Sequence, residues 1–349
     1  MKFKVDNERE RLDLFLARQF NARSNRKVSR SWIKKNIEAG NVLINQKIVR
    51  KAGEFVESGD QILCNFSSEL DESSRIDSAM GSLVQIVYED QELLIVNKPA
   101  GLAAHPVGGA KTISLIGILS PKLAVGTFAD KDRLGLVHRL DRDTTGLMVV
   151  AKNGEALKFL SEQFKPRFVE KKIIKEGVIE KQLAERVAHR RYLALCLTTP
   201  RAKRVFDLCE RGTIDLAIGH KKGDYLKMVP KGAGSGNGGG RRAVSDWQVI
   251  KRASYANLVG FSLRTGRTHQ IRVHCAAQKA PVLGDSKYGD FSLLPAGLRR
   301  AAADFGRQAL HAEYLSFVHP RTHKRVEFYV DLPDDFKELI KIFERWDLS

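Results

Sequence analysis

A polar, serine-rich stretch at residues 65–84 separates two parts of the chain whose hydrophobic patterns differ. Residues 1–64 carry apolar side chains at helical spacing, whereas residues 85–335 contain many short runs of the β type. The length of 349 residues also exceeds that of an average single domain. We therefore predict two domains joined by a linker at 65–84, with residues 336–349 forming a C-terminal helix or tail.

The first part predicts a compact α/β module. Two short helices are indicated by apolar residues at helical spacing, namely Leu12, Phe15 and Leu16, then Ile33 and Ile37. Ser29 stands where the N-cap of the second helix is expected, and Gly40 stands at its end. Val42 and Ile44 alternate with polar neighbours, which predicts a strand.

The second part predicts a mixed, largely antiparallel sheet with fewer helices. Its strand-type runs are IVYED, LLIVNK, GLMVVAK, RYLALCL and LVGFSL, and its clearest helix is GEALKFLSEQF. Two stretches differ from this pattern: residues 166–190 are charged and helix-prone, and residues 231–242 are glycine-rich, as in a mobile loop. The predicted fold class of the whole chain is therefore α+β.

The charge of the chain indicates what kind of partner it has. The formal net charge is +18, from 59 Lys and Arg against 41 Asp and Glu, and the basic residues are spread along the sequence. A dispersed basic surface favours a polyanion, with nucleic acid ahead of an anionic membrane. No run of about 18 apolar residues could span a bilayer, and charges interrupt the start, where a signal peptide is apolar. We expect a soluble, cytoplasmic protein.

The sequence offers no sign of a metal or cofactor site. The cysteines are far apart and none forms a Cys-x-x-Cys pair, so we expect free thiols at Cys64, Cys196, Cys209 and Cys275. A phosphate-binding Gly-x-x-x-x-Gly-Lys loop and a dinucleotide fingerprint are both missing. We therefore predict a protein that works without a bound cofactor or metal.

Two segments concentrate chemically useful side chains. In LVHRLDRDTTGLMVVAK, acidic and basic residues around Asp141 lie at a strand junction, although such a carboxylate can also simply cap a turn. In LRTGRTHQIRVHCAAQKAPVLGDSKYG, Ile271 and Val273 alternate with basic residues, which predicts a half-buried strand that could bind phosphate. Tyr192 heads an apolar strand, where a core role is the ordinary one for an aromatic residue.

These segments belong to a series of motifs that occur in the order of a known family. The motifs are NKPAG at Asn97–Gly101, HRLD with a Thr-x-Gly turn at His138–Gly146, Arg191-Tyr192, and TGRTHQIRVH at Thr265–His274, followed by GDSKYG at 284–289, RQALHA at 307–312 and His319-Pro320. On these motifs, residues 85–335 resemble the pseudouridine synthases of the large-ribosomal-subunit type. Residues 166–190 and the glycine-rich stretch look like insertions relative to that family, and both leave the motifs intact.

The first part separately resembles the S4 RNA-binding domain. The similar features are Arg-Leu-Asp, Ser-Arg, Gly-x-Val and a terminal Gly-Asp, found between Arg11 and Asp60. This resemblance implies that the partner is RNA. It also implies RNA contacts from four residues at the start of the second helix: Ser29, Arg30, Lys34 and Lys35.

The resemblance to the synthases implies an isomerase that detaches uracil from ribose at N1 and rejoins it through C5. It implies that Asp141 is the nucleophile, through either a covalent adduct or a glycal intermediate. A carboxylate in a closed pocket tends to take up a proton, and Arg272 is expected to oppose this by its charge. Tyr192 would hold the base and serve proton transfer from C5, and Arg139 would enter the stack that the uridine leaves.

The remaining implications concern binding and alternatives. RNA contacts are implied for further residues in or beside the motifs: His138, Thr145, Arg267, His269, Asn97 and Lys98. We expect a monomer without an obligate protein partner, acting on large-subunit ribosomal RNA, with transfer RNA as the second choice. A non-catalytic S4-type ribosome-assembly factor and a metal-dependent nuclease are the alternative functions, the latter supported only by the Asp141-Arg142-Asp143 string.

Overall fold

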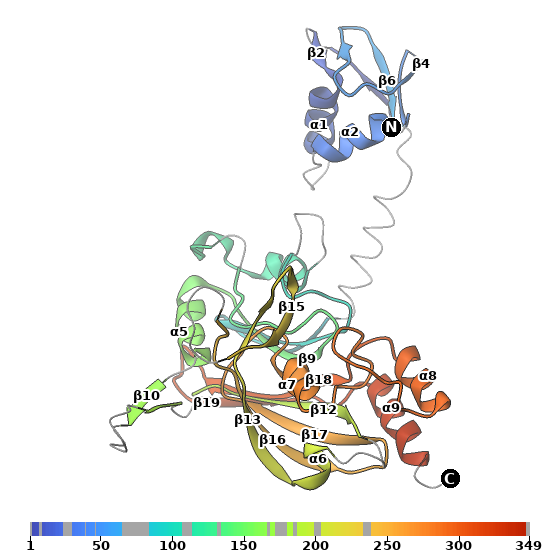
Figure 1. Ribbon diagram of the computed structural model, residues 1–349. Helices are drawn as coiled ribbons and strands as arrows, with labels where there is room; N and C mark the ends of the chain where they lie inside the picture. The colour runs from blue at the N-terminus through green and yellow to red at the C-terminus, as the bar shows by residue number, and fades with distance from the viewer. Residues whose placement is uncertain are drawn as a thin grey trace. The chain divides into compact units, whose positions relative to one another are not determined.

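The computed structural model describes residues 2–6, 9–23, 30–38, 40–45, 47–64, 84–106, 114–130, 134–165, 168–171, 180–183, 187–198, 204–232 and 239–346. The chain divides into two compact units, Met1–Ala79 and Met80–Ser349 (Figure 1). The linker expected at 65–84 lies outside the described residues except for Val84. Each unit is considered by itself.

The N-terminal unit is an α/β module built on a small sheet. Its four antiparallel strands have the order β1 (Lys2–Lys4), β6 (Gln61–Cys64), β3 (Val42–Ile44) and β4 (Lys47–Val49). Strands β2 (Glu10–Arg11) and β5 (Phe55–Val56) form a separate antiparallel pair. Helices α1 (Leu12–Arg23) and α2 (Arg30–Glu38) pack against each other.

The two helices predicted for this unit are confirmed. Their predicted apolar residues share one buried core: Leu12, Phe15, Leu16, Ile33 and Ile37. Gly40 follows α2 with a φ of 82°, a left-handed conformation that glycine adopts without a clash from a Cβ, and its N–H donates to Ile37 O. The predicted N-cap, Ser29, lies outside the described residues.

A nine-stranded mixed sheet forms the framework of the second unit. Its order is β13 (Arg211–Asp215), β16 (Val244–Lys251), β17 (Ala256–Leu263), β12 (His189–Leu197), β18 (Leu310–Val318), β9 (Thr145–Ala151), β8 (Leu93–Lys98) and β7 (Gln85–Glu89), with β19 (Arg325–Tyr329) also paired to β18. Neighbouring strands are antiparallel except β18 and β9, which are parallel. The predicted α+β class and all five predicted strand runs are confirmed.

Strands β8 and β9 bury side chains on both faces of this sheet. Leu94 and Val96 belong to the main core, whereas Leu93 and Ile95 belong to a second core on the opposite face. A strand that is covered on both sides loses the polar and apolar alternation of a half-exposed strand. The continuous apolar sequence of both strands follows from this position.

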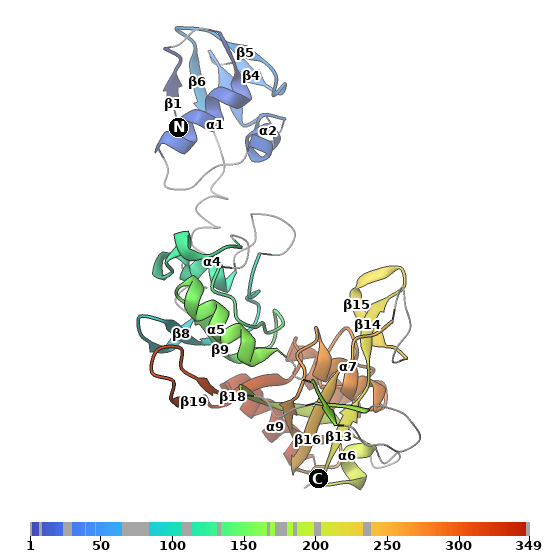
Figure 2. The same ribbon diagram turned by 90° about the vertical axis from the view of Figure 1, so that its left-hand side faces the viewer.

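Helix α5 (Gly154–Phe164) covers the second core, beside β9 (Figure 2). The Asn153 side chain caps its start by accepting the Ala156 N–H at 2.9 Å. Leu160 and Phe164 on its inner face are buried in that core. The clearest helix predicted from the sequence is thereby confirmed over the same residues.

The second unit has five further α-helices among the residues that the structure describes. They are α4 (Leu115–Leu119), α6 (Val205–Leu208), α7 (Gln270–Ala277), α8 (Ala296–Asp304) and α9 (Asp334–Arg345), with 3₁₀ turns at Ser120–Lys122 and Val125–Thr127. Helices α8 and α9 pack together, and α9 contributes three residues to the main core: Phe336, Leu339 and Phe343. The segment for which a C-terminal helix or tail is predicted thus contains a helix whose inner face packs into the core of the second unit.

Two predictions of local structure were wrong. The predicted strand around Ile271 is helix α7, in which every residue from Gln270 to Cys275 is buried. The basic side chains have buried partners of their own, so their alternation with apolar residues does not mark a solvent face. Within 166–190, the predicted helical stretch contains an antiparallel pair, β10 (Phe168–Lys171) with β11 (Glu180–Leu183). Pairing supplies these short segments with backbone hydrogen bonds that a short isolated helix holds only marginally.

A second antiparallel pair, β14 (Ile218–Lys221) with β15 (Asp224–Pro230), extends from the sheet near α7 (Figure 2). The glycine-rich stretch follows β15. Its residues 233–238 lie outside the described part of the chain.

Candidate active site

A cavity of about 210 Å³ lies in the second unit, where the segment before β9 meets β12 and the loop that leads into α7. Its polar lining consists of His138, Arg139, Asp141, Thr144, Arg190, Tyr192, Arg267, His269 and Arg272, with neighbouring Thr268 and Gln270. The three residues predicted to be catalytic come from distant parts of the sequence, and the fold brings all of them to this one cavity.

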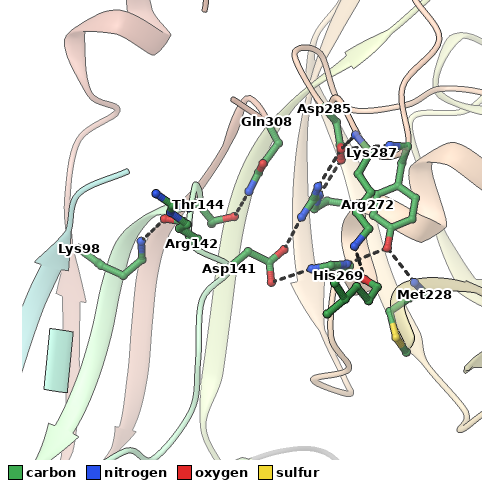
Figure 3. Close-up of polar contacts among 12 residues, drawn as sticks. Lys98, Asp141, Arg142, Thr144, Met228, His269, Arg272, Asp285, Lys287 and Gln308 are labelled. Carbon is green, nitrogen blue, oxygen red and sulfur yellow. Dashed lines mark hydrogen bonds and ion pairs between the residues drawn. The ribbon is translucent and has the colours of Figure 1, made fainter. Parts of the chain in front are cut away.

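Asp141 and Arg272 form an ion pair in this cavity. Arg272 Nη1 donates to Asp141 Oδ2 at 3.0 Å (Figure 3). The same guanidinium donates from Nε and Nη2 to the two carboxylate oxygens of Asp285, at 2.6 and 2.8 Å. The two-point contact expected for Asp141 is thus made to Asp285, and Asp141 receives a single hydrogen bond from Arg272.

The cluster of Asp141, Arg272 and Asp285 holds one positive charge between two negative ones. Burial alone would lower the pKa of Arg272, but the hydrogen bonds and charges of Asp285 and Asp141 outweigh burial and raise it. The side chain of Asp285 is fully buried, whereas that of Asp141 is 15% exposed. Asp141 is therefore the member of the cluster that a ligand in the cavity can reach.

Hydrogen bonds and a close backbone contact fix the turn that carries Asp141. The Thr144 N–H donates to the Asp141 carbonyl, and Gln308 Nε2 donates to Thr144 Oγ1 at 3.0 Å. Gly146 follows with a φ of 114°, and a Cβ there would lie 2.2 Å from the Ala312 carbonyl oxygen of β18. Only glycine allows this approach, so the Thr-x-Gly turn sets the position of Asp141 against the sheet.

Lys98, for which an RNA contact is predicted, holds the same turn. Its side chain is fully buried, and Nζ donates at 2.8 Å to the carbonyl of Arg142 (Figure 3). It also donates to the carbonyls of Pro99 and Leu102, each at 2.8 Å. Burial lowers the pKa of Lys98 to about 7, against the opposing charges of Asp143 and Asp141. An ammonium group enclosed by three carbonyls is a structural tie, because it has no surface to offer to RNA.

His269 stands at the opposite side of Asp141, in a left-handed conformation with a φ of 55°. Its Nε2 lies 3.9 Å from Asp141 Oδ1, and its Nδ1 is 2.7 Å from the Tyr288 hydroxyl. Burial lowers the pKa of His269 despite the nearby Asp141 charge. The imidazole is therefore neutral near pH 7, and Arg272 is the cation that balances Asp141.

Tyr192 lies in β12 and lines the cavity with only 5% of its surface exposed. Its ring also belongs to the main core, so one residue both packs in the core and lines the cavity. A ring fixed by packing offers a flat apolar surface, and its hydroxyl adds a polar end. The cavity thus combines a carboxylate, its guanidinium partner and an aromatic ring.

Comparison with known proteins identifies the family. The sequence pattern of the RNA pseudouridylate synthase family matches residues 92–174 and 177–277, and that of the S4 domain matches residues 10–62. The chain belongs to the RNA pseudouridylate synthase family. An RNA pseudouridine synthase of Bacillus subtilis is 35% identical to this synthase over 340 residues, which cover 96% of this chain and 95% of the relative.

Two relatives with more specific names show similar agreement. The ribosomal large subunit pseudouridine synthase D of Buchnera aphidicola is 34% identical, over 95% of this chain and 94% of the relative. The protein of the same name from Pseudomonas aeruginosa is 33% identical, over 96% of this chain and 92% of the relative. The human protein named RNA pseudouridylate synthase domain containing 4 shares the fold, with a TM-score of 0.54 over 78% of this chain and 97% of that chain, at 23% identity. The synthase is an RNA-modifying isomerase with an S4 RNA-binding domain.

Two of the other predicted RNA contacts do not lie in the cavity of the synthase. The Thr145 hydroxyl is buried against His311 Nδ1 at 2.8 Å, so this side chain joins β9 to β18. Asn97 Nδ2 donates to Gln85 Oε1 on β7 at 3.3 Å, and Asn97 is not part of the cavity lining. Four predicted contacts do line the cavity: His138, Arg139, Arg267 and His269.

In the N-terminal unit, basic residues line a surface hollow of about 620 Å³ that includes Arg30 and Lys34. Arg11 and Arg30 both hold the buried carboxylate of Asp13, with Nε contacts of 3.0 and 2.8 Å, while their own side chains remain about half exposed. Lys34 lies 3.7 Å from Glu38 one turn along α2. Ser29 and the side chain of Lys35 lie outside the described part of the unit.

Sequence reasoning missed Asp285 and Tyr288 as site residues. Both belong to the GDSKYG motif, which was recognised without a role for its side chains. The signal in the sequence was a carboxylate, Asp285, in a motif that follows TGRTHQIRVH. Only the fold shows that this carboxylate contacts Arg272. In the described residues, no group of three or more His, Cys, Asp or Glu is arranged to hold a metal ion. None of the described helices is long and apolar enough to cross a membrane.

Proposed function

We propose that this synthase converts uridine to pseudouridine in large-subunit ribosomal RNA, with Asp141 as the nucleophile and without a cofactor. The observation that carries the proposal is the contact of Asp141 with Arg272, because it keeps a carboxylate available at a cavity wall that is otherwise rich in donors. Asp285 occupies the rest of the guanidinium, so Arg272 cannot turn away from this position. The arrangement supports an anion poised to act on a neutral ribose.

The reaction balances without any added group. The bond between N1 of uracil and C1′ of ribose breaks, the base turns, and a bond forms between C5 and C1′. The proton lost from C5 is matched by one gained at N1, so the product has the same atoms as the substrate. Asp141 either forms an ester with C1′ or removes a proton from the ribose to give a glycal, and both routes require the carboxylate.

Tyr192 is proposed to hold the turning base and to serve the proton transfer from C5. Its packed ring offers a face to uracil, and its place on the cavity wall supports contact with a base that has left its helix or loop. The Arg139 side chain is exposed at the same cavity, which suits a residue that fills the space left by the uridine. The ribosomal substrate is proposed from the names of the Buchnera and Pseudomonas relatives.

The test measures tritium release from RNA transcripts that contain 5-tritiated uridine. Wild-type enzyme should release tritium from a large-subunit ribosomal transcript in the presence of a chelator, and it should release less from transfer RNA. Asp141→Asn should abolish release while RNA affinity stays within about three-fold, because the amide keeps the shape and removes the nucleophile.

The matched control is Asp143→Asn, since Asp143 lies two residues away and is not part of the cavity lining. This variant removes the same charge from the same segment and should retain most turnover. Substantial turnover by Asp141→Asn would overturn the assignment of the nucleophile. Preference for transfer RNA would overturn the proposed substrate and leave the chemistry in place.

A further inference from the structure

A part of the cavity wall formed by β12 and the segment before β9 carries hydrogen-bond donors that the proposed reaction does not use. Arg190 lines the cavity and is 7% exposed, and its Nε and Nη2 have no hydrogen-bond partner among the described residues. His138 lines the same cavity, and its Nδ1 is also buried without a partner in the described part of the chain. Buried polar atoms rarely lack a hydrogen-bond partner, so the presence of these atoms together in one cavity indicates that a ligand binds there.

The unpartnered nitrogen of His138 is a donor. The Val149 N–H donates to His138 Nε2 at 3.2 Å, so Nε2 must act as the acceptor. Burial, with a smaller contribution from the charge of Arg190, lowers the pKa of His138 well below its usual value. A neutral imidazole with an accepting Nε2 carries its proton on Nδ1. The wall therefore presents donors from both residues and no acceptor that would match them.

Phe164 holds these two side chains in place. The His138 ring stacks on the Phe164 ring with centroids 4.7 Å apart, and the Arg190 guanidinium carbon lies 5.5 Å from the same ring centre. The guanidinium also lies against Gly266, where a Cβ would come within 3.1 Å of Nη1. Because Gly266 is exposed and lines the cavity, the guanidinium is close to a part of the cavity that is open to solvent.

The charge of Arg190 identifies the ligand's chemistry. No carboxylate in the described residues pairs with Arg190, whereas Asp141 and Asp285 are both occupied by Arg272. A buried cation without a counter-charge is costly, and an anion that relieves this cost gains affinity from it. The anion that RNA carries is phosphate, and guanidinium groups match phosphate oxygens in geometry.

We propose that Arg190 and the Nδ1–H of His138 bind a backbone phosphate of the RNA next to the target uridine. The proposal rests on the proposed function, because it takes the uridine to lie at Asp141. The phosphate contact holds the ribose in register with the carboxylate, while the guanidinium rotates toward the cavity that it already lines. Arg190 is thus a binding and positioning residue, and the reacting atoms stay with Asp141 and Tyr192.

The experiment is a double-mutant cycle that combines one change in the protein with one change in the RNA. A short hairpin RNA that the wild-type enzyme modifies is prepared with a neutral methylphosphonate at the 5′ or the 3′ phosphate of the target uridine. Dissociation constants and kcat/KM are measured for wild type and Arg190→Gln on each RNA. With unmodified RNA, Arg190→Gln should lose about ten-fold or more, the usual value of one hydrogen bond to a charged group.

The coupling between the two changes decides the proposal. At one of the two positions, methylphosphonate should weaken wild type by about the same factor and weaken Arg190→Gln little further. Arg190→Lys, which keeps the charge, should recover part of the loss on unmodified RNA. Additive losses at both positions would overturn the phosphate contact, and they would point instead to a structural arginine or a contact with a uracil carbonyl.

Arg191→Gln is the matched control, because Arg191 is the next residue of the same strand but pairs with Glu313 at 2.6 Å and is absent from the cavity lining. Its loss should be small and the same with either RNA. Thermal melting of each variant identifies any that fails to fold, and if Arg190→Gln does not fold, Arg190→Met, which keeps the length of the side chain without its charge, is carried through the same cycle with the same criterion. Turnover by Asp141→Asn would contradict the proposed function. If Asp141→Asn is inactive but the losses caused by Arg190→Gln and by methylphosphonate are additive, only the phosphate contact is contradicted.

Discussion

In the N-terminal unit a buried carboxylate lies between two arginines, whereas in the catalytic unit a buried arginine lies between two carboxylates. Asp13 is 4% exposed, and its partners Arg11 and Arg30 are 44% and 53% exposed. Arg272 is 8% exposed, and of its partners Asp285 is enclosed and Asp141 faces the cavity. The first cluster leaves a net positive charge at the surface, and the second leaves a net negative charge at a cavity.

The opposite signs suit opposite tasks. Half-exposed guanidinium groups that are held by a carboxylate can still meet phosphate, with less side-chain freedom to lose on binding. A carboxylate that shares its guanidinium with a second carboxylate is held in place without having its charge fully balanced. On the proposed function, the same pair of residue types would serve binding in one unit and chemistry in the other, according to which member is buried.

The two units also differ in their buried titratable groups, which predicts different behaviour in acid. All nine histidines lie in the catalytic unit. Burial lowers the pKa of His311 to about 4 and lowers that of His138 as well. Between pH 6.5 and about 4 the unfolded chain thus binds more protons than the folded unit, so stability falls as the pH falls. His311 alone should cost about 3 kcal/mol across this range.

The N-terminal unit should resist this range. Burial would raise the pKa of Asp13, but its hydrogen bonds to Arg11 and Arg30 lower it below 3.8. Stability from Asp13 is then present above pH 3.8 and is lost only as the pH falls further. Amide hydrogen exchange on the intact protein should show the catalytic unit opening first as pH is lowered from 7 to 4. His311→Gln should reduce that difference, and simultaneous opening of both units would contradict it.

Arg272→Lys tests the catalytic cluster. Lysine keeps the charge but cannot contact both Asp285 oxygens and Asp141 in one plane, so turnover should fall by about 100-fold. RNA affinity should fall much less than turnover, because the guanidinium contacts two carboxylates. The alternative hypothesis is that Arg272 binds phosphate.

The two hypotheses for Arg272 are separated by measuring turnover and the salt dependence of RNA binding on the same variant. A phosphate contact would give weaker RNA binding with a shallower salt dependence. Asp285→Asn is a second probe, since Asp285 has no surface at the cavity. It should lower turnover without a matching loss of RNA affinity.

The smallest expected effect concerns Arg30 in the N-terminal cluster. Arg30→Gln should weaken RNA binding a few-fold and reduce the slope of log affinity against log salt by about 0.7 to 0.9, the value of one phosphate contact. Arg18→Gln in α1 removes the same charge from a side chain that pairs with Glu10 and should change the slope less. Equal slopes for both variants would show that the cluster is no better placed for RNA than the rest of the unit.

Most of the fold could be predicted from the sequence because helices and strands leave patterns among residues that are close together in the chain. Helices α1, α2 and α5 bury one face, so their apolar residues recur at the helical period, and the five predicted strands are short apolar runs between turns. Helix α7 was missed because it is buried on nearly all sides. Such a helix has no solvent-exposed face, so its sequence lacks the helical alternation of apolar and polar residues. Lys98 was assigned to RNA for a similar reason, since the sequence does not show which lysine is enclosed by carbonyls.

The sequence by itself determined the family, the residues of its motifs and the predicted nucleophile, because each motif is a contiguous string of side chains. Only the tertiary structure decided which charges meet. Arg272 contacts Asp285, which is 13 residues away in the sequence, and Asp141, which is 131 residues away. Whether a carboxylate reaches Arg190 likewise depends on the fold, and none of the described residues supplies one. Hydrophobic period and turn chemistry act between near neighbours in sequence, whereas pairing and burial of charge depend on distances in space, which chain order does not encode directly.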